Sequence, residues 1–177
     1  MKIYVIRHGQ TDVNVKNKIN ALNDDDLNEM GIMQAKEVGR KLENIDYDFI
    51  ISSPLTRTKH TAELLNIKNK DIKFDNRLLE RDAGVFTKQL IENIDEDDWW
   101  SLNPKQDYKD AETVKNVIDR IYDLLNELKK QKKDKTILLV THGGTSKAIS
   151  CYFKGIPENG IIRKYEQDNC EILEFDL

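Results

Sequence analysis

The chain has 177 residues, 34% of them charged, and its formal net charge is −4 at neutral pH. This length is enough to bury a real core, and we expect a single domain over residues 1–177. The acidic balance and the lack of a large basic block argue against nucleic acid as a partner. No apolar stretch reaches transmembrane length, and the apolar start is too short for a secretory signal, so we expect no membrane association.

The two cysteines, Cys151 and Cys170, do not form a CxxC or metal-binding pattern. We expect them to be free thiols in a reducing compartment, which indicates a cytoplasmic protein. The densest basic block, residues 129–133, falls at the end of a predicted helix, where cations interact favourably with the helix dipole. We therefore interpret this block as a helix end and not as a binding surface.

Helical and strand patterns alternate along the chain, which is typical of an α/β fold with a mainly parallel sheet. A first strand is predicted at about 2–6, and a loop rich in Asn, Asp and Lys follows over 11–26. A second strand is predicted at 48–52. Between this loop and the second strand, a helix carries apolar residues at roughly helical spacing: Met30, Met33, Val38 and Leu42.

The second strand is followed by Ser53 and Pro54, which have the pattern of an N-cap and a first-turn proline. They predict a helix that ends near Leu65. Residues 73–75 form a weak third strand, whereas residues 82–111 show no clear period. The middle of the chain is therefore the part in which the sequence predicts least regular structure.

The clearest helix covers about 112–130, because its apolar residues line one face. These residues are Val114, Val117, Ile118, Ile121, Leu125 and Leu128. A strand is predicted immediately before His142, and a helix follows over about 144–153. Alternation predicts a final strand at 170–175.

Two of the three histidines follow apolar runs with the pattern of buried parallel strands, and each is followed at once by glycine. They are His8, after residues 3–7, and His142, after residues 137–141. Ligands of open α/β sheets bind outside the carboxyl ends of the strands. Two imidazoles at that edge, with Arg7 beside the first, indicate chemistry on an anion. For a lone Arg-His pair, a strand end with a surface arginine would be the simpler interpretation.

Three polar residues near these strands suit an anion site. Arg7 offers a planar set of donors that fits phosphate or carboxylate, and Asn14 can add an uncharged donor. Arg57 falls in the first turn of a predicted helix, whose N-terminus already favours anions. A cation there is unfavourable to the helix unless an anion lies nearby, so Arg57 indicates an anion site more strongly than most arginines do. The alternative is a solvated arginine.

Glu80 follows the weak third strand and could donate a proton to a leaving alcohol, since a bound phosphate would help its carboxyl group to keep that proton. From its position alone, the simpler interpretation is that Glu80 is one of the 32 acidic residues of the chain without a catalytic role. His60 lies on nearly the same helical face as Arg57, with a packing or surface role as the simpler interpretation. Trp99 and Trp100 could form an apolar wall over a substrate or cover the core. No ligand set for a metal is complete.

Taken together, short blocks over nearly the whole chain resemble, in their order, the motifs of the histidine phosphatase superfamily, the phosphoglycerate-mutase-like proteins. The blocks are residues 7–11 with Asn14, 26–31 with 34–35, 52–57 with 61–62, 79–80 with Gly84, 112–113, and 141–144. Each block alone is moderately specific, whereas the ordered set is strong. The resemblance implies a three-layer α/β/α sandwich with a mainly parallel central sheet.

The resemblance also implies a role for each matched position. His8 would take the phosphoryl group as a phosphohistidine, and Glu80 would protonate the leaving oxygen and then activate water. The catalytic set would be Arg7, His8, Arg57, Glu80 and His142. The phosphate-binding set would be Arg7, His8, Asn14, Arg57, His142 and Gly143. The resemblance implies neither a metal nor a cofactor. The partner would be a small phosphorylated substrate. The protein itself would be a monomer or a homodimer.

Departures from the family pattern concern the substrate more than the catalytic core. Residues 18–21 replace the usual Arg-x-Gln-Gly, residues 85–88 replace Trp-Glu-Gly, and Ala111 stands where glycine is frequent. The span between Glu80 and Glu112 is brief, which favours an open site and hydrolysis over mutase chemistry. A mutase and a non-catalytic phosphate-binding module remain alternatives, and α-ribazole phosphate or a sugar phosphate is a plausible substrate.

Overall fold

The computed structural model describes residues 1–131 and 134–177. Its centre is a five-stranded sheet in the order β3-β2-β4-β1-β5. The strands are β1 (Lys2–Arg7), β2 (Phe49–Ser52), β3 (Ile72–Phe74), β4 (Thr136–Thr141) and β5 (Ile172–Asp176). Four strands are parallel, and β5 at one edge is antiparallel to β1. The prediction of an α/β fold with a mainly parallel sheet is therefore confirmed.

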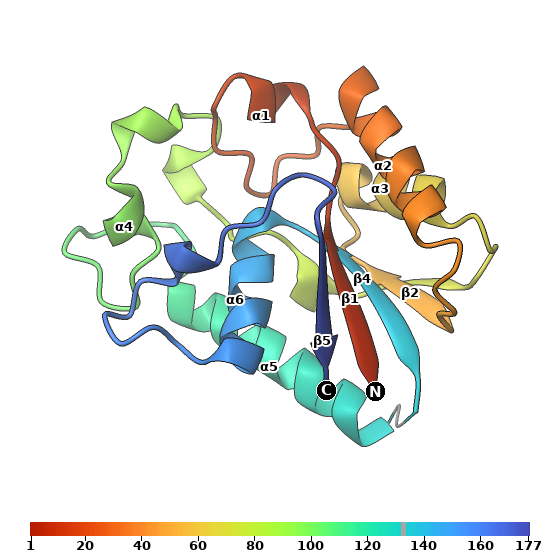
Figure 1. Cartoon of the computed structure of the whole chain (residues 1–177). Helices are drawn as coiled ribbons and strands as arrows, with labels where there is room; N and C mark the ends of the chain where they lie inside the picture. Colours follow the sequence, from red (N-terminus) through yellow and green to blue (C-terminus); the bar gives the residue numbers. More distant parts are fainter. Residues whose placement is uncertain (132–133) are drawn as a thin grey trace.

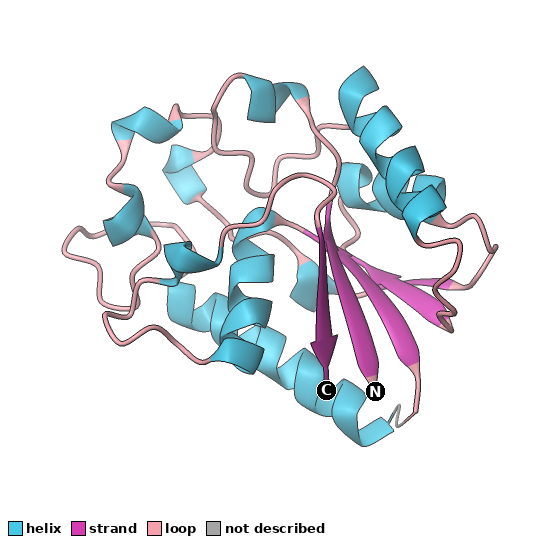
Figure 2. Ribbon diagram, in the orientation of Figure 1, coloured by secondary structure: helices cyan, strands magenta, loops and turns pink. Residues whose placement is uncertain are grey.

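Six α-helices connect and cover these strands in the described part of the chain. They are α1 (Asp12–Val15), α2 (Glu29–Lys41), α3 (Thr56–Leu65), α4 (Glu96–Trp99), α5 (Val114–Gln131) and α6 (Gly143–Lys154). Short 3₁₀ turns lie at Asn76–Leu78, Gly84–Phe86, Ile91–Asn93 and Ile162–Tyr165. Figure 1 shows α2 and α3 on one side of the sheet and α5 and α6 on the other, and Figure 2 shows the sheet between them.

Side chains of the central strands alternate between the two faces of the sheet, and each face is buried by one pair of helices. Tyr4 and Ile6 belong to a buried cluster with residues of α2 and α3. Ile3 and Val5 belong to the other cluster, together with the apolar face of α5 and residues of α6. All six apolar residues predicted for the face of α5 are buried. This arrangement is the expected three-layer sandwich.

The strand register brings the two histidines to one edge of the sheet. β1 and β4 are neighbours, and Arg7 pairs with Thr141. His8 and His142 therefore leave the sheet at adjacent positions. β2 lies on the other side of β4 and ends at Ser52, from which the chain leads to α3. The carboxyl ends of the parallel strands thus form the edge at which α/β folds bind ligands.

The buried stripe of α2 differs from the predicted one. Met30 and Met33 are exposed, whereas Val38 and Leu42 are buried. The other buried positions of this helix are small residues, Gly31, Ala35 and Gly39. At Gly31 a Cβ atom would lie 2.1 Å from the carbonyl oxygen of Gln10, so the helix needs glycine there to approach the loop after β1.

The start of α3 also differs from the prediction. Leu55 occupies the N-cap position and makes no side-chain cap, and Oδ1 of Asp24 accepts from the amide of Thr56 over 2.6 Å. The hydroxyl of Ser53 instead lies 2.8 Å from Nε2 of His142. The expected loop at 11–26 contains α1, which Thr11 caps through a capping box with Asn14. The last strand starts later than predicted, since Cys170 has a φ of 58°, outside the strand region.

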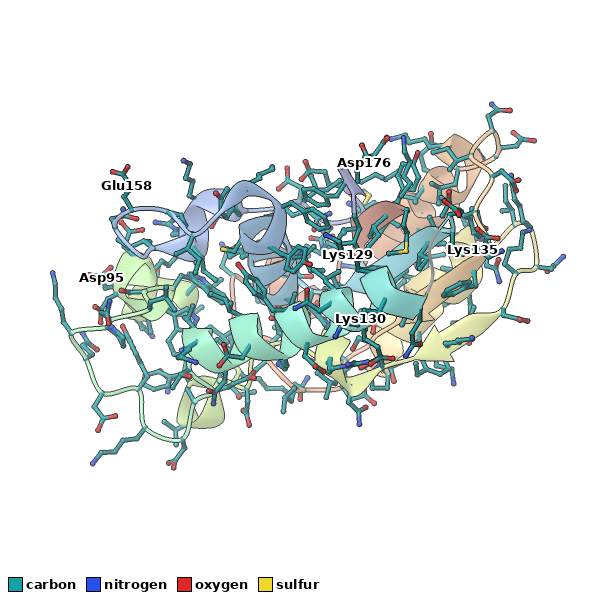
Figure 3. The ribbon with its side chains drawn as sticks, turned by 90° about the horizontal axis from the view of Figure 1, so that it is seen from below. Asp95, Lys129, Lys130, Lys135, Glu158 and Asp176 are labelled. Carbon is teal, nitrogen blue, oxygen red and sulfur yellow. The ribbon has the colours of Figure 1, made fainter. Side chains whose placement is uncertain are left out.

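The basic block at the end of α5 and the two cysteines were also predicted from the sequence. Lys129 and Lys130 lie on the last turn of α5, as predicted (Figure 3), whereas Lys132 and Lys133 fall outside the described residues. Cys151 and Cys170 are both free. Within residues 1–131 and 134–177, no helix is long and apolar enough to cross a membrane.

Candidate active site

His8 follows β1 directly and is almost fully buried. Its Nδ1 lies 2.7 Å from the carbonyl oxygen of Gly9, and that oxygen can only accept. The proton of the neutral ring therefore sits on Nδ1, and Nε2 carries the free electron pair. Nε of Arg57 donates to this nitrogen over 3.3 Å. The structure thus presents one nitrogen of His8 as an electron-pair donor beside a guanidinium group.

Gly9 allows the sharp turn that places His8. A Cβ atom at this position would lie 2.5 Å from the carbonyl oxygen of Gly31, which is a forbidden distance. The amide of Gly9 donates to Oγ1 of Thr61 on α3 over 3.0 Å. The turn is therefore held against α2 and α3, and only glycine fits it.

Arg57 occupies the first turn of α3 and has no exposed surface, which excludes the alternative of a solvated arginine. Its Nη1 donates to the carbonyl oxygen of Asn23 over 2.6 Å, and its Nη2 donates to that of Ala21 over 2.7 Å. Burial lowers the pKa of Arg57 to about 10, so the group stays charged at neutral pH. The loop before α2 therefore fixes this cation against His8.

His142 is the N-cap residue of α6 and is fully buried. Its ring lies 5.2 Å from the ring of His8 between centroids, with an angle of 62° between the planes. Its Nδ1 has no hydrogen-bond partner within the described residues. Burial, reinforced by the cation Arg57, holds the pKa values of both histidines well below their usual range. Both rings are therefore neutral at pH 7.

Arg7 ends β1 and turns its guanidinium toward the N-terminus of α6. A Cβ atom on Gly143 would lie 3.5 Å from Cζ of Arg7, so the two positions are in contact distance. Nη1 of Arg7 donates to the carbonyl oxygen of Gln167 over 2.7 Å, whereas its Nε has no partner among the described residues. This leaves a side-chain donor for an anion next to the N-terminus of α6.

The chain segment before β5 supports the site in a way that sequence reasoning missed. Asn169 donates to the carbonyl oxygen of His8 over 2.8 Å, and the amide of Cys170 donates to that of Arg7 over 3.0 Å. Gln167 is buried and donates to the carbonyl of Val5 over 3.0 Å. Nothing in the local sequence marks these residues, because their partners lie about 160 positions away along the chain.

Glu80 reaches the same pocket from the segment after β3. Its Oε2 accepts from the amide of Gly144 over 3.0 Å, and its Oε1 accepts from the amide of Arg81 over 2.8 Å. Asn14 lies on α1, with its Oδ1 bound by the amide of Thr11. Its amide nitrogen donates to no group in the described part of the chain, so it is available to an anion.

One pocket of about 240 Å³ joins most of the predicted residues. Those that line it are Arg7, His8, Asn14, Arg57, Glu80 and Gly143. His142 does not line it but touches the ring of His8 from behind. Trp99 and Trp100 line the pocket as well, so they form its wall, and Trp99 also packs in a small aromatic cluster. His60 lies outside and pairs with Asp26.

Further pocket residues were not singled out from the sequence. They include Arg81, Ile94 and Lys147, whereas Lys18 and Ile19, which also line the pocket, belong to the departure from the family pattern at residues 18–21. Among residues 1–131 and 134–177, no group of three or more His, Cys, Asp or Glu side chains is placed to hold a metal ion. The site therefore combines cations and neutral imidazoles with Glu80 beside an apolar wall, and three further carboxylate residues, Glu96, Glu166 and Asp168, also line the pocket.

Gly144 gives a test of this geometry. A Cβ atom there would lie 2.3 Å from Oε1 of Glu80 and 2.4 Å from Cη2 of Trp100. For the phosphomonoesters that the sequence resemblance implies as substrates, we expect Gly144→Ala to lower kcat/KM by about 10²-fold, because it displaces both side chains by a fraction of an ångström or more. Gly143→Ala is the matched comparison, since its Cβ meets only ordinary contacts and should cost much less. Equal losses would contradict the described position of Glu80.

The sequence model of the histidine phosphatase superfamily (branch 1) matches residues 3–177, and the chain belongs to this family. A relative described as a probable phosphoglycerate mutase GpmB, from Salmonella arizonae, is 32% identical; the match covers 99% of this chain and 85% of the relative.

Two solved structures resemble the chain, each with a TM-score of 0.86. A phosphoserine phosphatase variant from Entamoeba histolytica, in complex with phosphoserine, is 27% identical, with 99% of this chain and 90% of that chain covered. A mycobacterial glucosyl-3-phosphoglycerate phosphatase in complex with VO3 is 26% identical, with 98% and 91% covered. The resemblance inferred from the short blocks is therefore confirmed.

Proposed function

We propose that this protein hydrolyses phosphomonoesters of small metabolites, without a metal ion, through a phosphohistidine intermediate on His8. The observation that carries the proposal is the state of His8 Nε2. This nitrogen carries the lone pair of the neutral ring, accepts from Nε of the buried cation Arg57 over 3.3 Å, and shares a pocket with Arg7 and Glu80.

In the first step the electron pair of His8 Nε2 attacks the phosphorus atom, and the bond from phosphorus to the ester oxygen breaks. Glu80 gives its proton to that oxygen, so the alcohol leaves uncharged. Arg7 and Arg57 stabilise the charge on the phosphoryl oxygens, with the amide of Asn14 as an uncharged partner, and His142 supports the ring of His8 by edge-on contact. The carbonyl oxygen of Gly9 stabilises the positive charge that the imidazole acquires.

In the second step the carboxylate of Glu80 removes a proton from water, and the water oxygen attacks phosphorus. The N–P bond breaks, its electron pair returns to His8 Nε2, and inorganic phosphate is released. Dividing the displacement into two steps replaces one high barrier by two lower ones. Phosphomonoester hydrolysis is extremely slow in water, with known enhancements of up to about 10²¹, so fixed cations beside the phosphoryl group are the main requirement.

Hydrolysis is supported over mutase chemistry by the phosphatase relatives at 26% and 27% identity. A phosphoglycerate mutase is the second candidate, favoured by the Salmonella relative at 32% identity. The two differ only in the acceptor of the phosphoryl group, which is water in one case and a bound sugar acid in the other.

Turnover of para-nitrophenyl phosphate with and without a chelator tests the proposal. We expect full turnover with EDTA, because Arg7 and Arg57 supply the positive charge beside the phosphoryl group. Rapid denaturation in base should trap phosphate on His8, and warming in acid should release it, as expected for an N–P bond. Turnover lost to EDTA, or phosphate found on a serine or aspartate, would refute the scheme. Phosphate binding without turnover would favour a non-catalytic module.

A further inference from the structure

Lys147 is a buried cation that the proposed mechanism does not use. It lies on α6 just beyond the glycines that follow His142, lines the same pocket as His8 and Glu80, and is 7% exposed. Its only hydrogen bond within the described residues is a long one, 3.5 Å to the carbonyl oxygen of Gly143. An ammonium group has three donors, so at least two of them have no acceptor there.

No carboxylate in the described part of the chain forms an ion pair with Lys147. Its Nζ lies 4.9 Å from the ring centre of Trp100, which supplies a weak cation–π contact. Burial lowers the pKa of Lys147, and the charge of Glu80 opposes this shift only in part. A buried, poorly paired cation is unfavourable to the fold, and a methionine would fill the same space without that cost.

The reacting phosphoryl group already has cations beside the nucleophile. Arg57 contacts His8 Nε2, and Arg7 lies at the N-terminus of α6. The ammonium group of Lys147 lies between the carbonyl oxygen of Gly143 and Trp100, the aromatic wall of the pocket. A substrate with its phosphoryl group at His8 and its body along this wall would meet the ammonium group with its other end.

We propose that Lys147 binds a second anionic group of the substrate, a carboxylate or a second phosphate, and so selects phosphomonoesters that carry one. This inference rests on the proposed hydrolase function. It makes Lys147 a determinant of specificity whose unfilled donors receive acceptors only when such a substrate is bound. The departures from the family pattern in residues 18–21 leave Lys18 as a further cation in the same pocket.

A matched pair of substrates tests the inference. 3-Phosphoglycerate and glycerol 3-phosphate differ only in that a carboxylate replaces a hydroxymethyl group. We expect kcat/KM to favour 3-phosphoglycerate about tenfold or more, the effect of a charge-assisted hydrogen bond. Lys147→Met should remove most of this preference, mainly through KM for 3-phosphoglycerate. A second pair, fructose 1,6-bisphosphate and fructose 1-phosphate, tests in the same way whether Lys147 selects substrates with a second phosphate.

Lys154→Met is the control, because Lys154 is exposed on the same helix and does not line the pocket. It should keep the preference of the wild type. Thermal unfolding of each variant shows whether it is folded, and Lys147→Gln is a second variant in case Lys147→Met does not fold. The inference is overturned if the wild type shows no preference in either arm, or if Lys147→Met lowers kcat/KM equally for both members of a pair. If the wild type hydrolyses neither these substrates nor para-nitrophenyl phosphate, the proposed function fails, and calorimetric binding of the same pair still tests Lys147.

Discussion

Replacing His8 with alanine is expected to lower kcat/KM for para-nitrophenyl phosphate at least about 10⁴-fold, the scale of losses when a nucleophile is removed. The expectation follows from the ring's position, because Nε2 carries the lone pair of the neutral ring and accepts from Nε of Arg57 in the pocket. Initial rates with purified His8→Ala and wild type measure it. The variant should also give no acid-labile phosphate after quenching in base.

His60→Ala is the matched control for this experiment. His60 lies on α3, outside the pocket, and contacts Asp26 instead of the site. It should keep wild-type turnover and the phosphate trap. Circular dichroism should show that His8→Ala retains its fold, since removal of the imidazole ring leaves the backbone turn at Gly9 unchanged. A His8→Ala variant with more than a few per cent of wild-type turnover would remove His8 from the proposed mechanism.

The arrangement of the sheet explains why so much of the site could be predicted. The apolar runs before His8 and His142 are continuous because parallel strands are covered on both faces. Once both runs are strands of one parallel sheet, their carboxyl ends meet at one edge whatever the details of the loops. Arg57 could be predicted for a similar local reason, because a cation in the first turn of a helix needs an anion nearby.

The parts that could not be predicted depend on contacts between distant segments. Ser53 has the pattern of a helix cap, yet it contacts His142, and no local rule distinguishes these two partners. Asn169 supports His8 from the other end of the chain. Lys147 falls within a helix, where a lysine is ordinarily solvated, and only the packing of α6 behind the pocket buries it. Met30 and Met33 were misplaced because glycines, which have no apolar side chain, form the contact face of α2.

Replacing Glu80 with glutamine is expected to have an effect that depends on the leaving group. An alkyl phosphate releases a strongly basic oxygen that needs a proton, so its kcat should fall about 10²- to 10⁴-fold without the acid. A nitrophenolate is a far weaker base and leaves without a proton, so its release in the first turnover should be much less affected. Glycerol 3-phosphate and para-nitrophenyl phosphate, assayed with the same preparations, measure the two cases.

The amide side chain of Glu80→Gln keeps the size and one acceptor of the carboxyl group, so the bond from the amide of Gly144 can be retained. The side chain at position 80 therefore keeps nearly the same place in the variant, and the loss of activity reports on proton transfer. Glu63→Gln, an exposed change on α3, controls for the loss of one negative charge. Because Glu80 also activates water, a burst of nitrophenol followed by a slow steady rate is expected with the aryl substrate. Equal losses on both substrates, without a burst, would show that Glu80 orients the pocket and transfers no proton.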